Sequence, residues 1–188
     1  MKKSLCVLVV ALFAYRLFGQ GMLLWDESVN GPLSEDYTQP TSLGNLLLGT
    51  NSVIGSVSSV FTGTGYAAHD DYFTFTVQPG NSLAGVYISV NKPTLVWLGN
   101  PSFSTMIGQV FNPLNGEVLS QMGLGPLTSG TFGMYLANNE FVGSSSTSNY
   151  RLDFLVQSIP EPDTFPLIAL GAAALLIRSR QNKSKSRV

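Results

Sequence analysis

The stretch DYFTFTVQPG, residues 71–80, decides the fold class of this chain. Phe73, Phe75 and Val77 alternate with a tyrosine and two threonines, so the two sets face opposite sides of an extended strand. Aromatic and β-branched residues fill the stretch, and a Pro-Gly pair closes it as a turn. We therefore predict a strand over this stretch, with the Phe73, Phe75 and Val77 face buried.

The same period of two recurs through the middle of the chain. Residues 83–90 place Val86 and Ile88 inward and Tyr87 outward, and residues 94–98 are apolar on both faces, as in a central strand covered by two layers. Further strands are expected at residues 51–60, 108–111, 116–120, 131–136 and 150–156. No sustained helical period appears between them, so we predict an all-β sandwich over residues 22–159.

The order of these strands, from residue 50 to about residue 157, resembles the bacterial pre-peptidase C-terminal-like domain. The positions that fit its pattern are Asp71, Tyr72, Phe73, Gly80, Gly130 and Tyr135. This resemblance implies a jelly-roll-like antiparallel β-sandwich that serves as an accessory module and has no catalytic residues of its own.

Charge is distributed unevenly along the 188 residues. Both ends are basic, whereas residues 22–159 contain nine acidic residues and only Lys92 and Arg151 as bases. An acidic surface repels phosphate backbones, so we expect no nucleic-acid partner.

The N-terminus has the form of a secretory signal peptide, residues 1–21. Lys2 and Lys3 precede an apolar run at residues 5–15, and the small residue Gly21 suits cleavage. The alternative is an N-terminal core helix, but the run shows no amphipathic period. Removal of the signal takes away Cys6, the only cysteine, so the exported domain must be stabilised by its hydrophobic core.

Groups that could carry chemistry are sparse in the middle of the chain. His69 precedes Asp70 and Asp71, and we interpret this stretch as a polar loop entering a strand, with no metal site and no cofactor. A calcium site to which the two aspartates contribute ligands remains an open alternative. No nucleophile, phosphate-binding or dinucleotide motif is present, so we expect no enzyme activity.

Aromatic residues offer a second kind of site. A sugar-stacking platform is one interpretation, and core or cross-strand pairs are the other, with the outward Tyr87 the side chain of most interest. The candidates are Trp25, Trp97, Tyr66, Tyr72 and Tyr87.

The C-terminal region, residues 160–188, has three parts. Pro160, Glu161 and Pro162 form an extended segment, since each proline removes a backbone donor and restricts its predecessor. A helix is expected at about residues 164–177, whose apolar run spans roughly 20 Å at about 1.5 Å per residue, against a bilayer core of about 30 Å. The basic tail, residues 178–188, predicts a cytoplasmic C-terminus.

These three parts resemble the PEP-CTERM sorting signal, which is also known as the ice-binding-protein C-terminal motif, a label that implies no ice binding. The triplet is Pro160, Glu161 and Pro162, and Arg178 and Arg180 form the membrane stop. The resemblance implies cleavage by exosortase, a transient stay in the cytoplasmic membrane, and a final place at the cell surface or in a biofilm matrix with exopolysaccharide.

From these observations we predict a non-enzymatic, exported protein that exosortase sorts at its C-terminus. Two alternatives remain open. One is a carbohydrate- or protein-binding module of the matrix, and the other is an accessory β-domain with a permanent membrane anchor.

Overall fold

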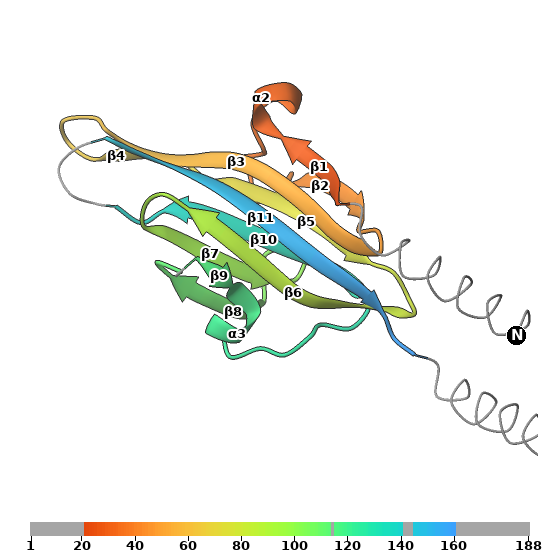
Figure 1. Cartoon of the computed structure of the whole chain (residues 1–188). Helices are drawn as coiled ribbons and strands as arrows, with labels where there is room; N and C mark the ends of the chain where they lie inside the picture. The colour runs from red at the N-terminus through yellow and green to blue at the C-terminus, as the bar shows by residue number, and fades with distance from the viewer. Residues whose placement is uncertain (1–20, 114, 141–144, 161–188) are drawn as a thin grey trace, which may run out of the picture. The chain divides into compact units, whose positions relative to one another are not determined.

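The computed structural model describes residues 21–113, 115–140 and 145–160 (Figure 1). Contacts divide the chain into two units, Met1–Ser158 and Ile159–Val188. The first contains two β-sheets that face each other (Figure 1), so the predicted β-sandwich is confirmed. The expected signal helix, the C-terminal helix and the basic tail lie outside the described residues.

The first sheet is built around two long central strands, which pair antiparallel over most of their length. Its order is β1-β3-β11-β6-β9. β4 pairs with the C-terminal end of β3, past the residues of β3 that pair with β1. The strands are β1 (Met22–Asp26), β3 (Gly49–Phe61), β4 (Tyr66–His69), β6 (Asn81–Val90), β9 (Gly116–Glu117) and β11 (Ser146–Ser158).

The second sheet has the order β2-β5-β10-β7-β8. Its strands are β2 (Thr41–Asn45), β5 (Asp71–Val77), β7 (Thr94–Gly99), β8 (Met106–Phe111) and β10 (Gly130–Asn138). Two single-turn helices, α2 (Glu27–Asn30) and α3 (Val118–Gln121), lie in the connections. None of the helices in the described residues is long and apolar enough to cross a membrane.

The sandwich departs from the predicted antiparallel arrangement at two edges. β1 runs parallel to β3, and β2 runs parallel to β5. A parallel pair requires a crossover connection in place of a tight hairpin. The N-terminal segment supplies it, because the chain leaves β1 in the first sheet, forms β2 in the second, and then returns to form β3.

The core lies between the sheets, as the alternation in residues 71–80 predicts. Phe73, Phe75 and Val77 are at most 1% exposed, and the Phe75 ring packs against Phe154 with a centroid separation of 4.9 Å. The predicted orientation of residues 83–90 is also confirmed, since Val86 and Ile88 are buried and Tyr87 is 45% exposed.

Two strand predictions need correction. Residues 94–98 do form β7, but this strand is second from the sheet edge, and the loop after it, not a second layer, covers its outer face. In residues 116–120 only Gly116–Glu117 is a strand. The Glu117 carboxylate accepts hydrogen bonds from the backbone N–H groups of Leu119 and Ser120, and this cap starts helix α3.

Candidate functional site

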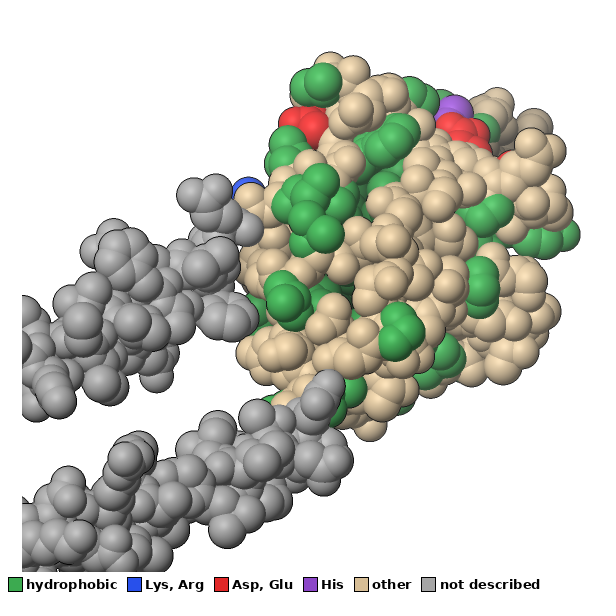
Figure 2. All heavy atoms as spheres, turned by 90° about the vertical axis from the view of Figure 1, so that its right-hand side faces the viewer, with side chains coloured by type: hydrophobic (Ala, Val, Ile, Leu, Met, Phe, Trp, Pro, Cys, Tyr) green, Lys and Arg blue, Asp and Glu red, His purple; other side chains and the backbone are tan. Residues whose placement is uncertain are grey.

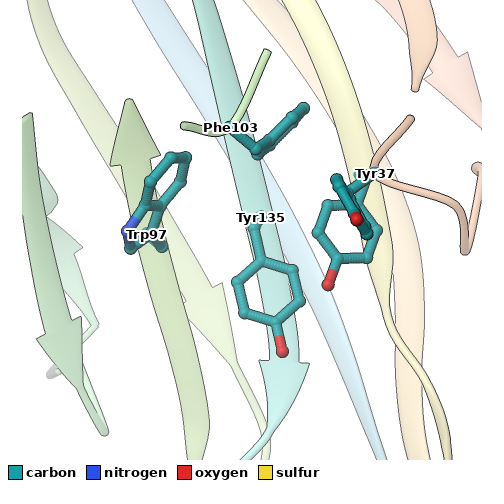
Figure 3. A pocket seen from close by; sticks show the side chains of 5 residues that line it. Tyr37, Trp97, Phe103 and Tyr135 are labelled. Carbon is teal, nitrogen blue, oxygen red and sulfur yellow. The ribbon is translucent and has the colours of Figure 1, made fainter. Parts of the chain in front are cut away.

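Five aromatic side chains line a pocket on the outer face of the second sheet (Figure 3). Three of them stand on neighbouring strands and two come from loops, and the cavity has a volume of about 260 Å³. The residues are Tyr37, Tyr72, Trp97, Phe103 and Tyr135.

Sheet register brings the three strand residues into one row. Tyr135 on β10 lies opposite Tyr72 on β5 and opposite Trp97 on β7. The rings of Tyr72 and Tyr135 stack, with centroids 4.6 Å apart and planes 23° apart. Cross-strand aromatic pairs of this kind stabilise a sheet, so the floor of the pocket is fixed by the fold itself.

Phe103 comes from the loop between β7 and β8. Its ring stacks on Trp97 at 5.5 Å and meets Tyr72 edge-on at 5.3 Å. The carboxamide oxygen of Asn100 accepts hydrogen bonds from the backbone N–H groups of Ser104 and Thr105, which holds this loop in shape. Phe103 is therefore a fixed wall of the pocket.

Glycine at position 133 allows this loop to lie on β10. A Cβ atom at Gly133 would lie 2.6 Å from the carbonyl oxygen of Asn100 and 3.0 Å from the Phe103 ring. Gly99, paired with Gly133 across the strands, leaves room for the Trp97 ring in the same way. The two glycines thus leave the space that the Phe103 and Trp97 rings occupy, and we call Gly99 and Gly133 the glycine shelf.

The pocket has a polar end at the tyrosine hydroxyl groups. Tyr135 Oη donates a 2.9 Å hydrogen bond to Oδ2 of Asp70. Burial raises the pKa of the Asp70 carboxyl group, the Tyr135 hydrogen bond opposes that shift, and the charge of Glu35 adds to it. Burial and the Asp70 charge also raise the pKa of Tyr135. A carboxylate and a phenol therefore sit together beside the aromatic rings.

The sequence-based aromatic candidates separate into four places. Trp97 and Tyr72 do come together, but Trp25 lies on β1, where its indole N–H donates to the carbonyl of Gly31. Tyr66 packs on Phe61 in the β3–β4 hairpin, and Tyr87 is on the outer face of the first sheet.

Three pocket residues were missed by sequence reasoning. Tyr135 could have been found, because it occupies an outward position in the predicted strand at residues 131–136. Tyr37 and Phe103 lie in loops, where no periodic pattern indicates which way a side chain points.

The histidine and the two aspartates do not form a common site. His69 lies in strand β4, not in the loop that we predicted, and its Nδ1 is 2.7 Å from Oε1 of Glu35. Figure 2 shows the histidine beside acidic side chains. Asp70 faces Tyr135, whereas Asp71 accepts a hydrogen bond from Tyr150 in the core. Among the residues that the structure describes, no three potential metal ligands gather.

The triplet at the C-terminal end of the sandwich is only partly described. β11 ends at Ser158, where it still pairs with Asn81 of β6, and Pro160 follows as an exposed residue. The other predicted sorting and membrane-stop residues lie outside the described range: Glu161, Pro162, Arg178 and Arg180.

Comparison with family models decides the nature of this end. A model of the PEP-CTERM protein-sorting motif matches residues 158–181. The chain carries a PEP-CTERM sorting motif. The PEP-CTERM motif begins at the last residue of β11, so the recognised segment starts where the sandwich ends. The PEP-CTERM motif supports the interpretation that this is an exported protein, which exosortase processes and sorts to the cell surface.

The remaining comparisons add little. No curated protein matches the chain. One solved structure, PliG of Salmonella Typhimurium, a periplasmic inhibitor of g-type lysozyme, is 11% identical with a TM-score of 0.32. The alignment covers 62% of this chain and 99% of PliG.

Proposed function

We propose that this chain is a non-enzymatic, exported β-sandwich protein that exosortase delivers to the cell surface or to an extracellular polysaccharide matrix. The observation that carries the proposal is the PEP-CTERM motif at residues 158–181. In this proposal residues 1–21 direct export, and the C-terminal segment crosses the cytoplasmic membrane until the enzyme acts.

The position of the motif suits such processing. β11 lies between β3 and β6 in the first sheet and stays paired up to Ser158. A cut near Pro160 would therefore leave all described strands of the sandwich in place, because β11 is the last strand that the structure describes in either sheet. Exosortase can release the folded domain without unfolding it.

A second candidate function within the same class is that of a carbohydrate-binding module, and the aromatic pocket favours it. Half-exposed rings with a few polar groups are common in sites that bind sugars or other small ligands. The titratable groups nearby are engaged with one another, Asp70 with Tyr135 and His69 with Glu35. This arrangement suits binding better than proton transfer.

The proposal is tested with the full chain in a host that has an exosortase. Glu161→Ala should leave the uncut chain in the inner-membrane fraction, whereas the wild type should mature, as judged by intact mass. Glu140→Ala, which removes a surface carboxylate of the sandwich, should mature normally. Equal maturation of the Glu161→Ala variant and the wild type would contradict exosortase sorting, and release of reducing ends from added polysaccharide would contradict the non-enzymatic role.

A further inference from the structure

The aromatic pocket presents ring faces and ring edges to a ligand from several directions. Tyr72, Trp97, Phe103 and Tyr135 are each partly exposed, and Tyr37 is 56% exposed at the margin. Figure 3 shows Trp97 and Tyr37 on opposite sides of the pocket, with Phe103 and Tyr135 between them. The sheet holds Tyr72, Trp97 and Tyr135 in place, and the loop at Asn100 holds Phe103, so a ligand need not order these four rings.

The size of the pocket limits what it can hold. Its volume of about 260 Å³ is slightly below the range of roughly 300–1,000 Å³ that is typical for drug-sized ligands. One ring-sized unit with an apolar face fits this space, whereas several units of a polymer would extend beyond it. The space therefore suits one residue of a polymer, or a small molecule of that size.

Charge distinguishes between ligands of similar size. Within the described residues the only lysine and the only arginine, Lys92 and Arg151, lie next to the carboxylates of Glu140 and Asp153. Beside the pocket Asp70 is hydrogen-bonded to Tyr135. Glu35 and His69, which pair with each other at 2.7 Å, act on the pKa of Asp70 in opposite directions. No lysine or arginine of the described chain lines the pocket. Anionic ligands are repelled there, and a cation is favoured.

We propose that the aromatic pocket binds one amino-bearing sugar ring of a cationic polysaccharide. The C–H face of the sugar packs on the aromatic rings, and its protonated amine lies at the ring faces, within the field of the Asp70 carboxylate. A cation over an aromatic face gains about 0.5–2 kcal/mol, and five rings surround this space. This inference rests on the proposed function only in that delivery to the cell surface would bring the pocket to such a polymer.

The test uses the full chain, purified in mild detergent, with the Trp25→Phe substitution, so that Trp97 is the only tryptophan. Three oligosaccharides of equal length are titrated: a glucosamine oligomer, which is cationic, its N-acetylated form, which is neutral, and a glucuronate oligomer, which is anionic. The glucosamine oligomer should change Trp97 emission in a saturable way, and added salt should weaken this binding. The N-acetylated form should bind at least about tenfold more weakly, and the glucuronate oligomer should not bind.

Two variants with matched exposure locate the binding site. Tyr37→Ala removes a loop side chain that is 56% exposed, so the fold should survive, and the dissociation constant should rise by about tenfold. Tyr87→Ala removes a 45% exposed tyrosine from the other sheet and should leave affinity unchanged.

Three results would overturn the proposal: no binding of the glucosamine oligomer, equal binding of the N-acetylated oligomer, or unchanged affinity in Tyr37→Ala. The titration involves no cleavage at residues 160–162, so a lack of binding would contradict the ligand proposal and not the proposal of exosortase sorting. A wild-type chain that stays uncut but still binds the oligomer would contradict the sorting proposal and not the ligand proposal.

Discussion

The hydroxyl group of Tyr150 on β11 donates a 2.6 Å hydrogen bond to Oδ2 of Asp71 on β5. The two strands belong to different sheets, and each side chain is 3% exposed. A buried polar pair thus bridges the two sheets of the sandwich. Burial raises the pKa of Asp71 to about 8, although the Tyr150 hydrogen bond opposes the shift.

This pair predicts a pH-dependent stability. The usual carboxyl value is 3.8, so between pH of about 4 and 8 the folded state keeps a proton that the unfolded chain releases. The free energy of unfolding should therefore fall as pH rises through this window. Asp71→Asn cannot ionise, yet its carbonyl oxygen can still accept the bond from Tyr150. It should match the wild type near pH 4 and exceed it by a few kcal/mol near pH 8, on the order set by the shift.

Urea unfolding at several pH values checks this expectation. A wild-type curve that is flat between pH of about 4 and 8, or one that rises, would contradict it. Asp153→Asn is a suitable comparison, because that carboxylate pairs with Arg151 on the first sheet and is not among the charges that raise the pKa of Asp71.

The core predicts a large cost for one phenylalanine. Residues 22–159 expressed alone should give a soluble monomer with β-type circular dichroism, and Phe75→Ala should lower its free energy of unfolding by about 3–5 kcal/mol. Phe75 is 1% exposed and packs on Phe132 and Phe154. Phe111→Ala, at a residue that is 57% exposed, should cost less than about 0.5 kcal/mol. A helical spectrum, or equal losses in both variants, would refute the packing described above.

The glycine shelf predicts a local effect on the pocket. Gly133→Ala places a methyl group against the carbonyl oxygen of Asn100 and the Phe103 ring, so the loop must move away from Trp97. Overpacking of this kind costs about 1–3 kcal/mol, and in the Trp25→Phe background Trp97 emission should shift to longer wavelength. Gly125→Ala, where a Cβ meets nothing within 4 Å, is the matched control. Identical emission spectra of the two variants would show that the loop does not rest on Gly133.

The basic tail predicts the orientation of the unprocessed chain. In a strain without exosortase, a reporter active only in the cytoplasm should work when fused after Val188 and stay silent when fused after Ser158. Replacing the tail's basic residues with glutamine should weaken the stop, since the apolar run of residues 165–177 is short for a bilayer. The substituted residues are Arg178, Arg180, Lys183, Lys185 and Arg187. Unchanged membrane fraction and orientation would show that the apolar run anchors the chain unaided.

The sequence by itself determined which faces of the main strands are buried and where the sorting motif lies. Both are local properties. The alternation of Phe73, Phe75 and Val77 needs only the geometry of one extended strand, and the Pro-Glu-Pro triplet is read from neighbouring residues. Local reasoning failed at residues 118–120, because the side-chain cap from Glu117 starts helix α3 there and outweighed the strand pattern.

Only the tertiary structure decided the parallel edges, the pairing of Asp71 with Tyr150 and the aromatic pocket. Asp71 and Tyr150 are 79 positions apart, and the pocket gathers residues from Tyr37 to Tyr135. These contacts depend on strand order and register, which are set by the fit of both sheets over a shared core. No single stretch of the sequence contains the strand order and register, because both are stabilised by contacts between surfaces that meet only in the folded chain.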